Sequence, residues 1–389
     1  MHIFKVRLAV LLALFIFAMS GLLVISTNLN RTHAQTVKSQ TQHTTRWEWT
    51  DDGWRRRVEI RGKAEFNEDY SDINALSEGG SLRLEEDHDG EFRRLDVRRD
   101  ENGQLQRKYF VNGEARVLDA NGKKWVAGLL LTAVRQGAID TDKRVQTILR
   151  QRGIDGVLEE IASISGDHAR RVYFKSLIRN ESLSRSDLQK AIEAAGVKLT
   201  SDYDKANLLK DSADLFLGQA NLSSAFFKVV STIKSDYEQR QILSALLKQN
   251  NLSEPVLAQM LESLAGIASD YEKANFLKDG ADLFLSYATL SNPFFKAVST
   301  INSDYEQRQI LSALLKRNKL SESVLRQMLD SLETISSDYE KATFLLEASR
   351  MYTGDARLRN AFLKATETIK SEHERGRVLS ALLRNKQIG

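Results

Sequence analysis

A serine-aspartate-tyrosine triplet recurs in this chain at a fixed interval of 34 residues. The triplet begins at Ser201, Ser235, Ser269, Ser303 and Ser337, and a degenerate copy begins at Ser371. A fixed period of this length is typical of stacked helical repeats, in which each hairpin buries its apolar face only against its neighbours. The period therefore predicts architecture. It says little about chemistry, because the partner of such a surface is not written in the repeat.

Each serine is followed three positions later by an acidic residue, as Ser235 is by Glu238. This is the pattern of a capping box, in which the serine side chain accepts from the N3 amide and the N3 carboxylate accepts from the serine amide. We therefore expect six helices that begin in register. The tyrosines of the triplets are expected to act as spacers between hairpins, with ligand stacking as the alternative. They are Tyr203, Tyr237, Tyr271, Tyr305 and Tyr339.

The true unit is a pair of unlike hairpins, because residues 201–268 and 269–336 are identical at 50 of 68 aligned positions. The first helix of alternate hairpins is predicted to be about one turn longer, from a four-residue shift in the start of the second helix. Differences between the two copies fall mainly at polar or loop positions, which fits either a retuned surface or drift. Arg240 and Arg308, identical in both copies, are candidate partner contacts.

The N-terminus has the features of an export signal. Lys5 and Arg7 precede an apolar stretch at 8–25, and Ala34 follows a polar segment in a position that suits signal peptidase. The stretch is also long enough to remain as a membrane anchor. Residues 1–34 are thus predicted to be a signal peptide or an anchor, and both place the rest of the chain outside the cytoplasm, in a bacterial periplasm or secreted. Membrane contact is expected only through this segment, if it is uncleaved.

Four further segments follow. The polar residues 35–45 predict a flexible linker. Residues 46–120 alternate with period two between turn dipeptides, which predicts a small antiparallel module of about four to six strands. Residues 121–164 predict connecting helices, and residues 165–389 an α-hairpin solenoid. The fold class is therefore α+β, an antiparallel sheet followed by an all-α solenoid of HEAT or TPR type, although the landmark residues of the tetratricopeptide repeat are missing.

Three segments together resemble a known group of proteins. These are the strand Ile60–Phe66, the acidic turn Asp72–Gly80 and the repeated Ser-Asp-Tyr-Glu hairpins. Over residues 46–389 the chain resembles uncharacterised bacterial envelope proteins, and similar modules are attached to membrane metallopeptidase sensors of the antibiotic-sensing type. The resemblance implies an envelope location and a sensing or scaffolding role. The metallopeptidase domain itself is absent from this chain, so the resemblance supplies no catalytic residue.

Composition excludes several kinds of chemistry. The 389 residues include no cysteine, so disulfides and thiolate catalysis are ruled out. The pI is near 9.0, but the region from residue 201 onward holds 24 basic and 24 acidic side chains. Scattered charge does not predict a phosphate-binding face, so no nucleic-acid partner is expected. The sequence lacks the usual hydrolase, metalloprotease and nucleotide motifs, which predicts a protein that is not an enzyme and needs no cofactor.

Two features of the sheet region carry alternatives. Trp47, Trp49 and Trp54 are expected either to pack in the core or to form an exposed platform for a sugar or a partner. The acidic run at 85–91 is expected to be a solvated hairpin tip, with a weak cation site as the alternative. The preferred interpretation is a non-enzymatic scaffold that binds a protein or peptide of the cell envelope through the solenoid surface. The alternative is a sensory or regulatory ectodomain whose β module binds a cell-wall-derived or small ligand.

Overall fold

The computed structural model describes residues 22–23, 35–41, 44–51, 53–317, 320–349, 351 and 356–387. Within them an antiparallel sheet is followed by helices, so the predicted α+β class is confirmed. The chain divides into two compact units, residues 1–176 and 177–389. The predicted signal peptide or anchor at 1–34 lies outside the described residues, except for Leu22–Leu23. Among the described helices, none combines the length and the apolar character needed to cross a membrane.

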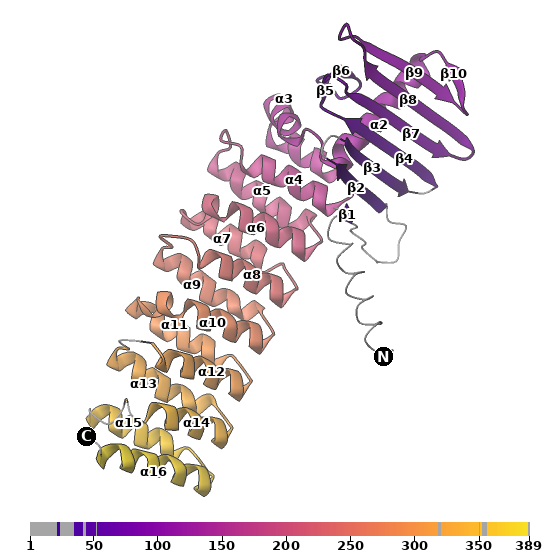
Figure 1. The fold of residues 1–389 in the computed structure, drawn as a ribbon. Helices are drawn as coiled ribbons and strands as arrows, with labels where there is room; N and C mark the ends of the chain where they lie inside the picture. The colour runs from indigo at the N-terminus through magenta and orange to yellow at the C-terminus, as the bar shows by residue number, and fades with distance from the viewer. Residues whose placement is uncertain are drawn as a thin grey trace, which may run out of the picture. The chain divides into compact units, whose positions relative to one another are not determined.

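The first unit is built on a sheet whose strand order is β1-β2-β3-β4-β7-β8-β9-β10, with β5 and β6 paired separately (Figure 1). The strands are β1 (Leu22–Leu23), β2 (Gln35–Thr41), β3 (Thr44–Asp51), β4 (Trp54–Arg61), β5 (Ala64–Phe66), β6 (Ile73–Leu76), β7 (Ser81–His88), β8 (Glu91–Arg99), β9 (Leu105–Val111) and β10 (Glu114–Arg116).

The linker predicted at 35–45 is wrong, because β2 pairs along its whole length with β3. Backbone hydrogen bonds hold a strand near the sheet edge without an apolar face, so its polar composition gave no strand signal. The sheet consequently has eight strands in the described residues, more than the predicted four to six.

Alternate residues of the central strands form the core of this unit. Val58 of β4, Leu84 of β7 and Leu95 of β8 are fully buried together with Leu129 and Val134 of the helix α2 (Ala120–Gly137). Asp119 caps that helix by accepting from the Gly122 amide at 2.8 Å. The helix supplies the second layer that one face of the sheet needs in order to exclude water.

The other face of the sheet carries charged pairs between neighbouring strands. Arg46 of β3 lies opposite Glu59 of β4, and their side chains approach to 2.8 Å. Arg83 of β7 likewise donates to Asp96 of β8 at 2.6 Å. Such opposed charges on a wet face favour one strand register over its neighbours, because a one-residue slip would move them to the core face.

The remaining helices are α3 (Thr141–Ala162), α4 (Asp167–Ile178), α5 (Arg185–Lys198), α6 (Asp202–Phe216), α7 (Ala220–Val230), α8 (Asp236–Leu246), α9 (Glu254–Ser263), α10 (Asp270–Leu285), α11 (Ala288–Ser299), α12 (Asp304–Leu315), α13 (Glu322–Asp330), α14 (Asp338–Ala348), α15 (Ala356–Glu367) and α16 (Glu372–Gln387). Two short 3₁₀ turns, η1 (Leu264–Gly266) and η2 (Ser331–Thr334), follow α9 and α13. Within α3, Gly153 has non-helical backbone angles (φ 66°, ψ −169°) and separates two helical segments that meet there at a kink.

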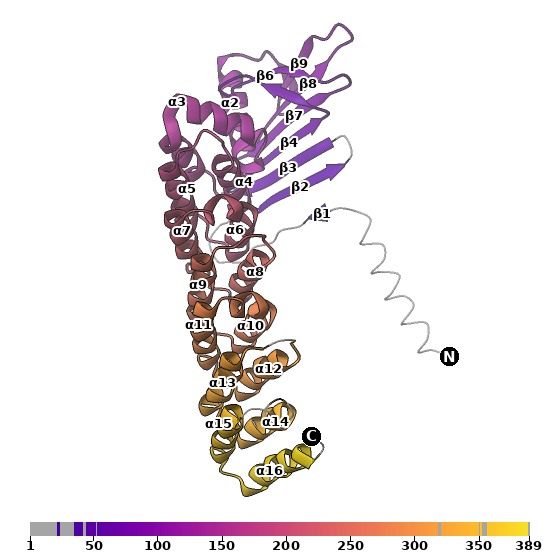
Figure 2. The ribbon, with the colours of Figure 1, turned by 90° about the vertical axis from the view of Figure 1, so that its left-hand side faces the viewer.

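In the second unit the helices form two layers (Figure 2). We call the helices that follow the serine caps the A helices; they are α6, α8, α10, α12, α14 and α16. Each A helix contacts the next A helix. We call the helices between them the B helices; they are α7, α9, α11, α13 and α15, and each contacts the next B helix. The six predicted helix starts are thus confirmed. The longer first helix is confirmed too, since α6 and α10 span 15 and 16 residues against 11 and 12 for α8 and α12.

Candidate functional site

Of the two hydrogen bonds of the predicted capping box, the serine caps form only the one that the serine hydroxyl accepts. The Ser235 hydroxyl accepts from the Glu238 amide at 3.3 Å, and the same bond recurs at each cap from Ser201 to Ser371. The reciprocal half is wrong. The Ser235 amide does not turn to Glu238 but donates to Asp202 Oδ2 of the preceding repeat, at 2.9 Å.

This contact between repeats, which we call the aspartate clamp, occurs at every step of the stack. Asp202 also accepts from the Lys234 amide at 3.0 Å, so one carboxylate holds two successive N–H groups before the next helix. The same pair of bonds is made by Asp236, Asp270, Asp304 and Asp338. The clamp fixes each helix start relative to the one before it, which the local box would not do.

The acidic residue at the third helical position therefore serves another purpose. Glu272 pairs with Arg240 of the previous repeat, and Glu340 pairs with Arg308 at 2.7 Å. Both arginine side chains are largely covered, with 18% and 13% of their surface exposed. That Arg240 and Arg308 contact a partner stays a prediction, since the structure shows what these arginines bind within the chain. Their first role is to join neighbouring repeats, because their Nε atoms are engaged by the glutamates.

The tyrosines of the triplets are exposed, and the expectation that they act as spacers between hairpins is wrong. Between 51% and 63% of each ring lies open to solvent along Tyr203, Tyr237, Tyr271, Tyr305 and Tyr339. We call this set the tyrosine ladder. The clamps and ion pairs set the distance between repeats, so the rings at the second helical position are free to point outward. Their hydroxyl groups make no hydrogen bond within the described part of the chain.

Two of the rings carry a cation. The guanidinium carbon of Arg240 lies 5.6 Å from the Tyr237 ring centre, and that of Arg308 lies 5.0 Å from Tyr305. Residues three apart on a helix share a face, which brings each arginine beside its own tyrosine. An arginine held by glutamate on one side fixes the ring beside it on the other. It also leaves the terminal guanidinium nitrogens, which donate no hydrogen bond among the described residues, next to the ladder.

A second row of side chains lies four residues after each tyrosine and therefore on the same helical face. Its members are Asn207, Gln241, Asn275, Gln309 and Thr343. All are half-buried, and none of them bonds to another group of the described chain. A side-chain amide offers two donors and one acceptor. We call each tyrosine together with the residue four positions later a rung of the ladder. The first four rungs combine an exposed ring with an unused side-chain amide, and the fifth combines an exposed ring with an unused hydroxyl. Sequence reasoning missed this row, although its fixed distance from each tyrosine was a readable signal.

The layer beneath the ladder is rigid. The residue after the acidic one is lysine or glutamine in alternate repeats, and it is buried in both. Lys273 Nζ donates to the Thr300 carbonyl at 3.4 Å, while Gln307 bonds the Ile301 carbonyl and accepts from the Thr334 hydroxyl at 2.7 Å. Lys273 thus satisfies a carbonyl of the loop that leads into the next cap, and Gln307 satisfies one of the loop that leads into its own cap, so both loops are tied to the A helices.

The tryptophans of the sheet do not form an exposed platform. Trp47 and Trp49 are only 6% and 4% exposed and belong to the core of the first unit. A Cβ on Gly137 would lie 2.7 Å from Trp47 Nε1, so a glycine is needed where α2 meets that ring. Trp54 is half-buried and stacks on His88, with ring centres 3.6 Å apart. Trp54, the first residue of β4, thus packs against the last residue of β7, whereas Trp47 and Trp49 are core residues.

The acidic run of that hairpin is used in ion pairs. Glu86 accepts from Arg56 and from the Trp125 indole, at 2.8 and 2.9 Å, and Glu85 pairs with Arg57. Within the described residues no three histidine, aspartate or glutamate side chains gather as a metal site would require.

A buried charge cluster lies elsewhere in the first unit. Glu160 of α3 accepts from Arg135 and Arg144 at 2.8 and 2.6 Å, and Arg144 lies over the ring of Tyr70, whose hydroxyl donates to Asp140 at 3.0 Å. Burial raises the pKa of Glu160, but the two guanidinium groups lower it by more, so its pKa falls below the usual 4.5. Burial and Asp140 raise the pKa of Tyr70. Because its charges are paired with one another, we interpret the cluster as a structural ion-pair network.

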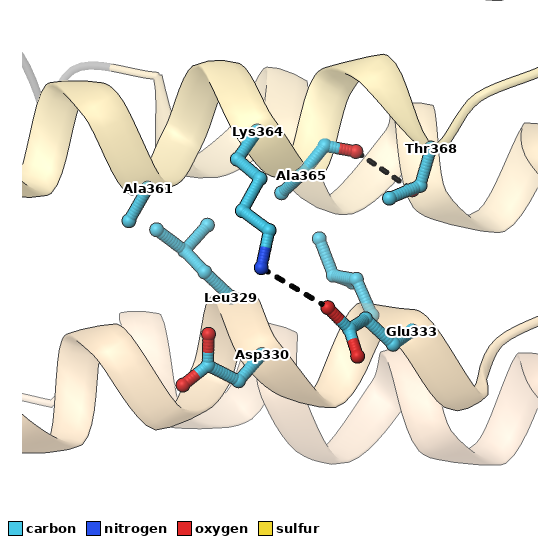
Figure 3. Close-up of a pocket in the computed structure, with 8 residues that line it drawn as sticks. Leu329, Asp330, Glu333, Ala361, Lys364, Ala365 and Thr368 are labelled. Atoms are coloured by element: carbon cyan, nitrogen blue, oxygen red, sulfur yellow. Dashed lines mark hydrogen bonds and ion pairs between the residues drawn. The ribbon is translucent and has the colours of Figure 1, made fainter.

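The second unit has a small cavity between α13 and α15 (Figure 3). It is lined by Leu329, Asp330, Leu332, Glu333, Ala361, Lys364, Ala365 and Thr368. Lys364 Nζ of α15 and Glu333 Oε1 of η2, the turn that follows α13, form an ion pair at 3.6 Å. The cavity belongs to the B layer, and the tyrosine ladder does not line it.

Comparisons with known proteins add little. No family model matches the chain, and no curated protein matches it. Among solved structures, a de novo designed 16-helix transmembrane nanopore aligns over 64% of each chain at 13% identity. Its TM-score is 0.12, which carries no argument about this protein.

Proposed function

We propose that this protein is a non-enzymatic scaffold that binds a protein or peptide through the tyrosine ladder. The observation that carries the proposal is the combination of an exposed ring with an unused amide or hydroxyl at five successive helix starts. Tyrosine is favoured at recognition surfaces because it offers a large contact area at a low entropic cost. The rings are carried by helices that ion pairs and buried hydrogen bonds hold in place, and the polar groups beside them have no partner among the described residues. A preorganised binding surface needs both features.

The finer description of the fold belongs to the same proposal. We infer that the second unit is an α-hairpin solenoid of 34-residue repeats, paired into 68-residue units. The support is the clamp that recurs between every two caps and the contact of each helix with its own kind in the next hairpin. A solenoid presents one long surface from many short elements, so weak contacts at each rung add up along a bound chain.

Site-specific photo-crosslinking tests the binding surface. A benzophenone amino acid in place of Tyr271 samples the ladder, and the same residue in place of the exposed Asn292 on helix α11 samples the B layer. We expect a discrete adduct in the native cell from position 271 and none from position 292. Equal adducts from both positions would indicate unspecific contact and would contradict a binding site on the ladder.

The proposal includes an extracytoplasmic location, supported by the apolar stretch at 8–25 after Lys5 and Arg7. The chain has no cysteine, so one introduced at the exposed Ser231 gives a background-free label. A membrane-impermeant maleimide should label Ser231→Cys in intact cells as fully as in lysed cells. Labelling only after lysis would place the second unit inside the cytoplasm. The mass of the mature chain separates a cleaved signal from a retained anchor.

A further inference from the structure

We propose that the ligand of the tyrosine ladder is a cationic, proline-rich segment in the polyproline II conformation. This inference rests on the proposed function, since it names the class of partner that the same surface takes. Three independent features of the ladder lead to it: its spacing, its hydrogen-bonding groups and its charge.

The spacing of the rungs selects the conformation of the ligand. Packed helices lie roughly 8–10 Å apart, so successive tyrosines of the A layer repeat at about that distance. A polyproline II helix has three residues per turn and rises about 9 Å per turn, so every third residue returns to the same side at the pitch of the ladder. Three residues of a β-strand cover a similar length, but its side chains alternate, and successive rungs would meet opposite faces. The ladder therefore matches polyproline II and not an extended strand.

The polar groups of the ladder match the same ligand. Polyproline II has no internal hydrogen bonds, so its carbonyl groups remain free to accept. Gln241 and Gln309, with their unused amides, lie beside Tyr237 and Tyr305, and the terminal nitrogens of Arg240 lie next to the first of these. Proline rings pack on aromatic faces while nearby donors reach the carbonyls, which is how aromatic-lined grooves recognise proline-rich segments.

The charge of the ladder sets the charge of the ligand. Between the residue before each of the five serine caps and the fifth residue after it, the chain carries ten acidic and six basic side chains. The positive ends of the five helices offset roughly half a charge each, which leaves this edge negative. A segment with lysine or arginine between its prolines is the complementary partner. The occupant is not a part of this chain, because the chain holds only two prolines, Pro255 and Pro293, in or next to its own helices.

The test uses synthetic peptides and the full-length chain in a titration followed by fluorescence anisotropy. The probe is five repeats of Pro-Pro-Lys, one for each rung, with shorter versions of two to four repeats. Five repeats of Gly-Ser-Lys keep the charge and remove the polyproline II preference, and five repeats of Pro-Pro-Glu do the reverse. We expect the proline-lysine peptide to bind at least about tenfold more tightly than either control, with affinity rising at each added repeat.

Matched variants of the chain locate the binding. The triple substitution Tyr237→Ala, Tyr271→Ala and Tyr305→Ala should weaken binding of the proline-lysine peptide by at least about tenfold. The control substitutes three exposed asparagines of the B layer, Asn221→Ala, Asn292→Ala and Asn360→Ala, and should leave affinity within about twofold. Gln241→Ala with Gln309→Ala provides a second test that leaves every ring in place, and it should weaken binding as well. Circular dichroism verifies that each variant is folded.

The outcomes separate this inference from the proposed function. Equal binding of the Gly-Ser-Lys peptide, or unchanged binding by the tyrosine variant, overturns the polyproline II ligand. Tighter binding of a β-1,4-linked N-acetylglucosamine hexamer, lost in the tyrosine variant, overturns it in favour of a glycan. A specific crosslink at position 271 without peptide binding leaves the scaffold standing and defeats only the ligand class. Absence of both defeats the scaffold as well.

Discussion

The contacts that stabilise the first unit internally differ from those that stabilise the second. In the first unit, contacts join residues far apart in sequence, and each contact exists once; Trp125 bonds Glu86 across 39 positions, and Tyr70 bonds Asp140 across 70. In the second unit, contacts join residues 32 or 33 positions apart, and each contact is repeated at every step. A single-copy network fails as a whole when one member is lost, whereas a repeated one fails locally. The second unit should therefore tolerate single substitutions better than the first.

The largest effect is expected from Glu160→Gln in the first unit. The substitution removes the charge that pairs with Arg135 and Arg144 and leaves two covered cations without their carboxylate, which costs about 3–5 kcal/mol of unfolding free energy. All four tryptophans lie between residues 47 and 125, so tryptophan fluorescence during urea unfolding reports this unit alone. The neighbouring substitution Glu159→Gln breaks only an exposed pair with Arg152 and should cost less than about 1 kcal/mol. Similar losses from both would show that the buried cluster has no special weight.

Acid reproduces the same loss reversibly. The pKa of Glu160 is lower in the folded state than its usual 4.5 because Arg135 and Arg144 outweigh the cost of burial. The stability it contributes is therefore fully present above about pH 4.5 and is lost as pH falls through the lowered folded value. Tryptophan fluorescence should show the first unit weakening in that window, and Glu160→Gln should flatten the dependence. A variant that loses stability as steeply as the parent would assign the acid sensitivity to other carboxylates.

A smaller effect is expected from Asp270→Ala in the second unit. The Asn302 and Ser303 amides lose their shared acceptor, and water replaces it in part, so the local cost is roughly 1 kcal/mol. Hydrogen exchange should accelerate at these two amides and at the start of α12, while the tryptophan signal of the first unit stays unchanged. Asp279→Ala, an exposed residue of the same helix, serves as the control. Slower folding of the whole chain would contradict the local character of the clamp.

The smallest effect on stability is expected from Tyr271→Ala. Because its ring is 60% exposed, truncation should change the unfolding free energy of the second unit by less than about 0.5 kcal/mol. Phe276 on the same helix is fully buried, and Phe276→Ala should cost about 3–5 kcal/mol. Thermal unfolding followed at 222 nm measures both. A large loss for Tyr271→Ala would assign the ladder to packing and remove the basis for a binding site.

Sequence reasoning reached the second unit more easily than the first. The spacing of the serines predicted every A helix start, because a repeated pattern averages out local ambiguity. It failed where the partner of a group lay in the next repeat. Ser235 and Glu238 satisfy the capping-box pattern perfectly, yet the serine amide bonds Asp202, and no local pattern distinguishes the two outcomes.

In the first unit the errors arose from strands held by backbone pairing and from side chains whose burial depends on the opposite layer. Strand β2 is polar, so its composition predicts a linker. Trp47 and Trp49 alternate with polar residues as a surface strand would, and only the approach of α2 at Gly137 shows which face is covered. The candidate site itself was half visible: the ring positions were clear from the period, but their exposure and the free amides beside them required the structure.

The aspartate clamp also has a direction. Each aspartate precedes the two amides that it binds by 32 and 33 residues, so it is synthesised first. A chain that emerges from the ribosome or passes through a membrane channel with its N-terminus first therefore always presents a finished hairpin with a vacant acceptor to the hairpin that follows. Assembly of the second unit can proceed in step with synthesis, each completed hairpin selecting the position of its successor.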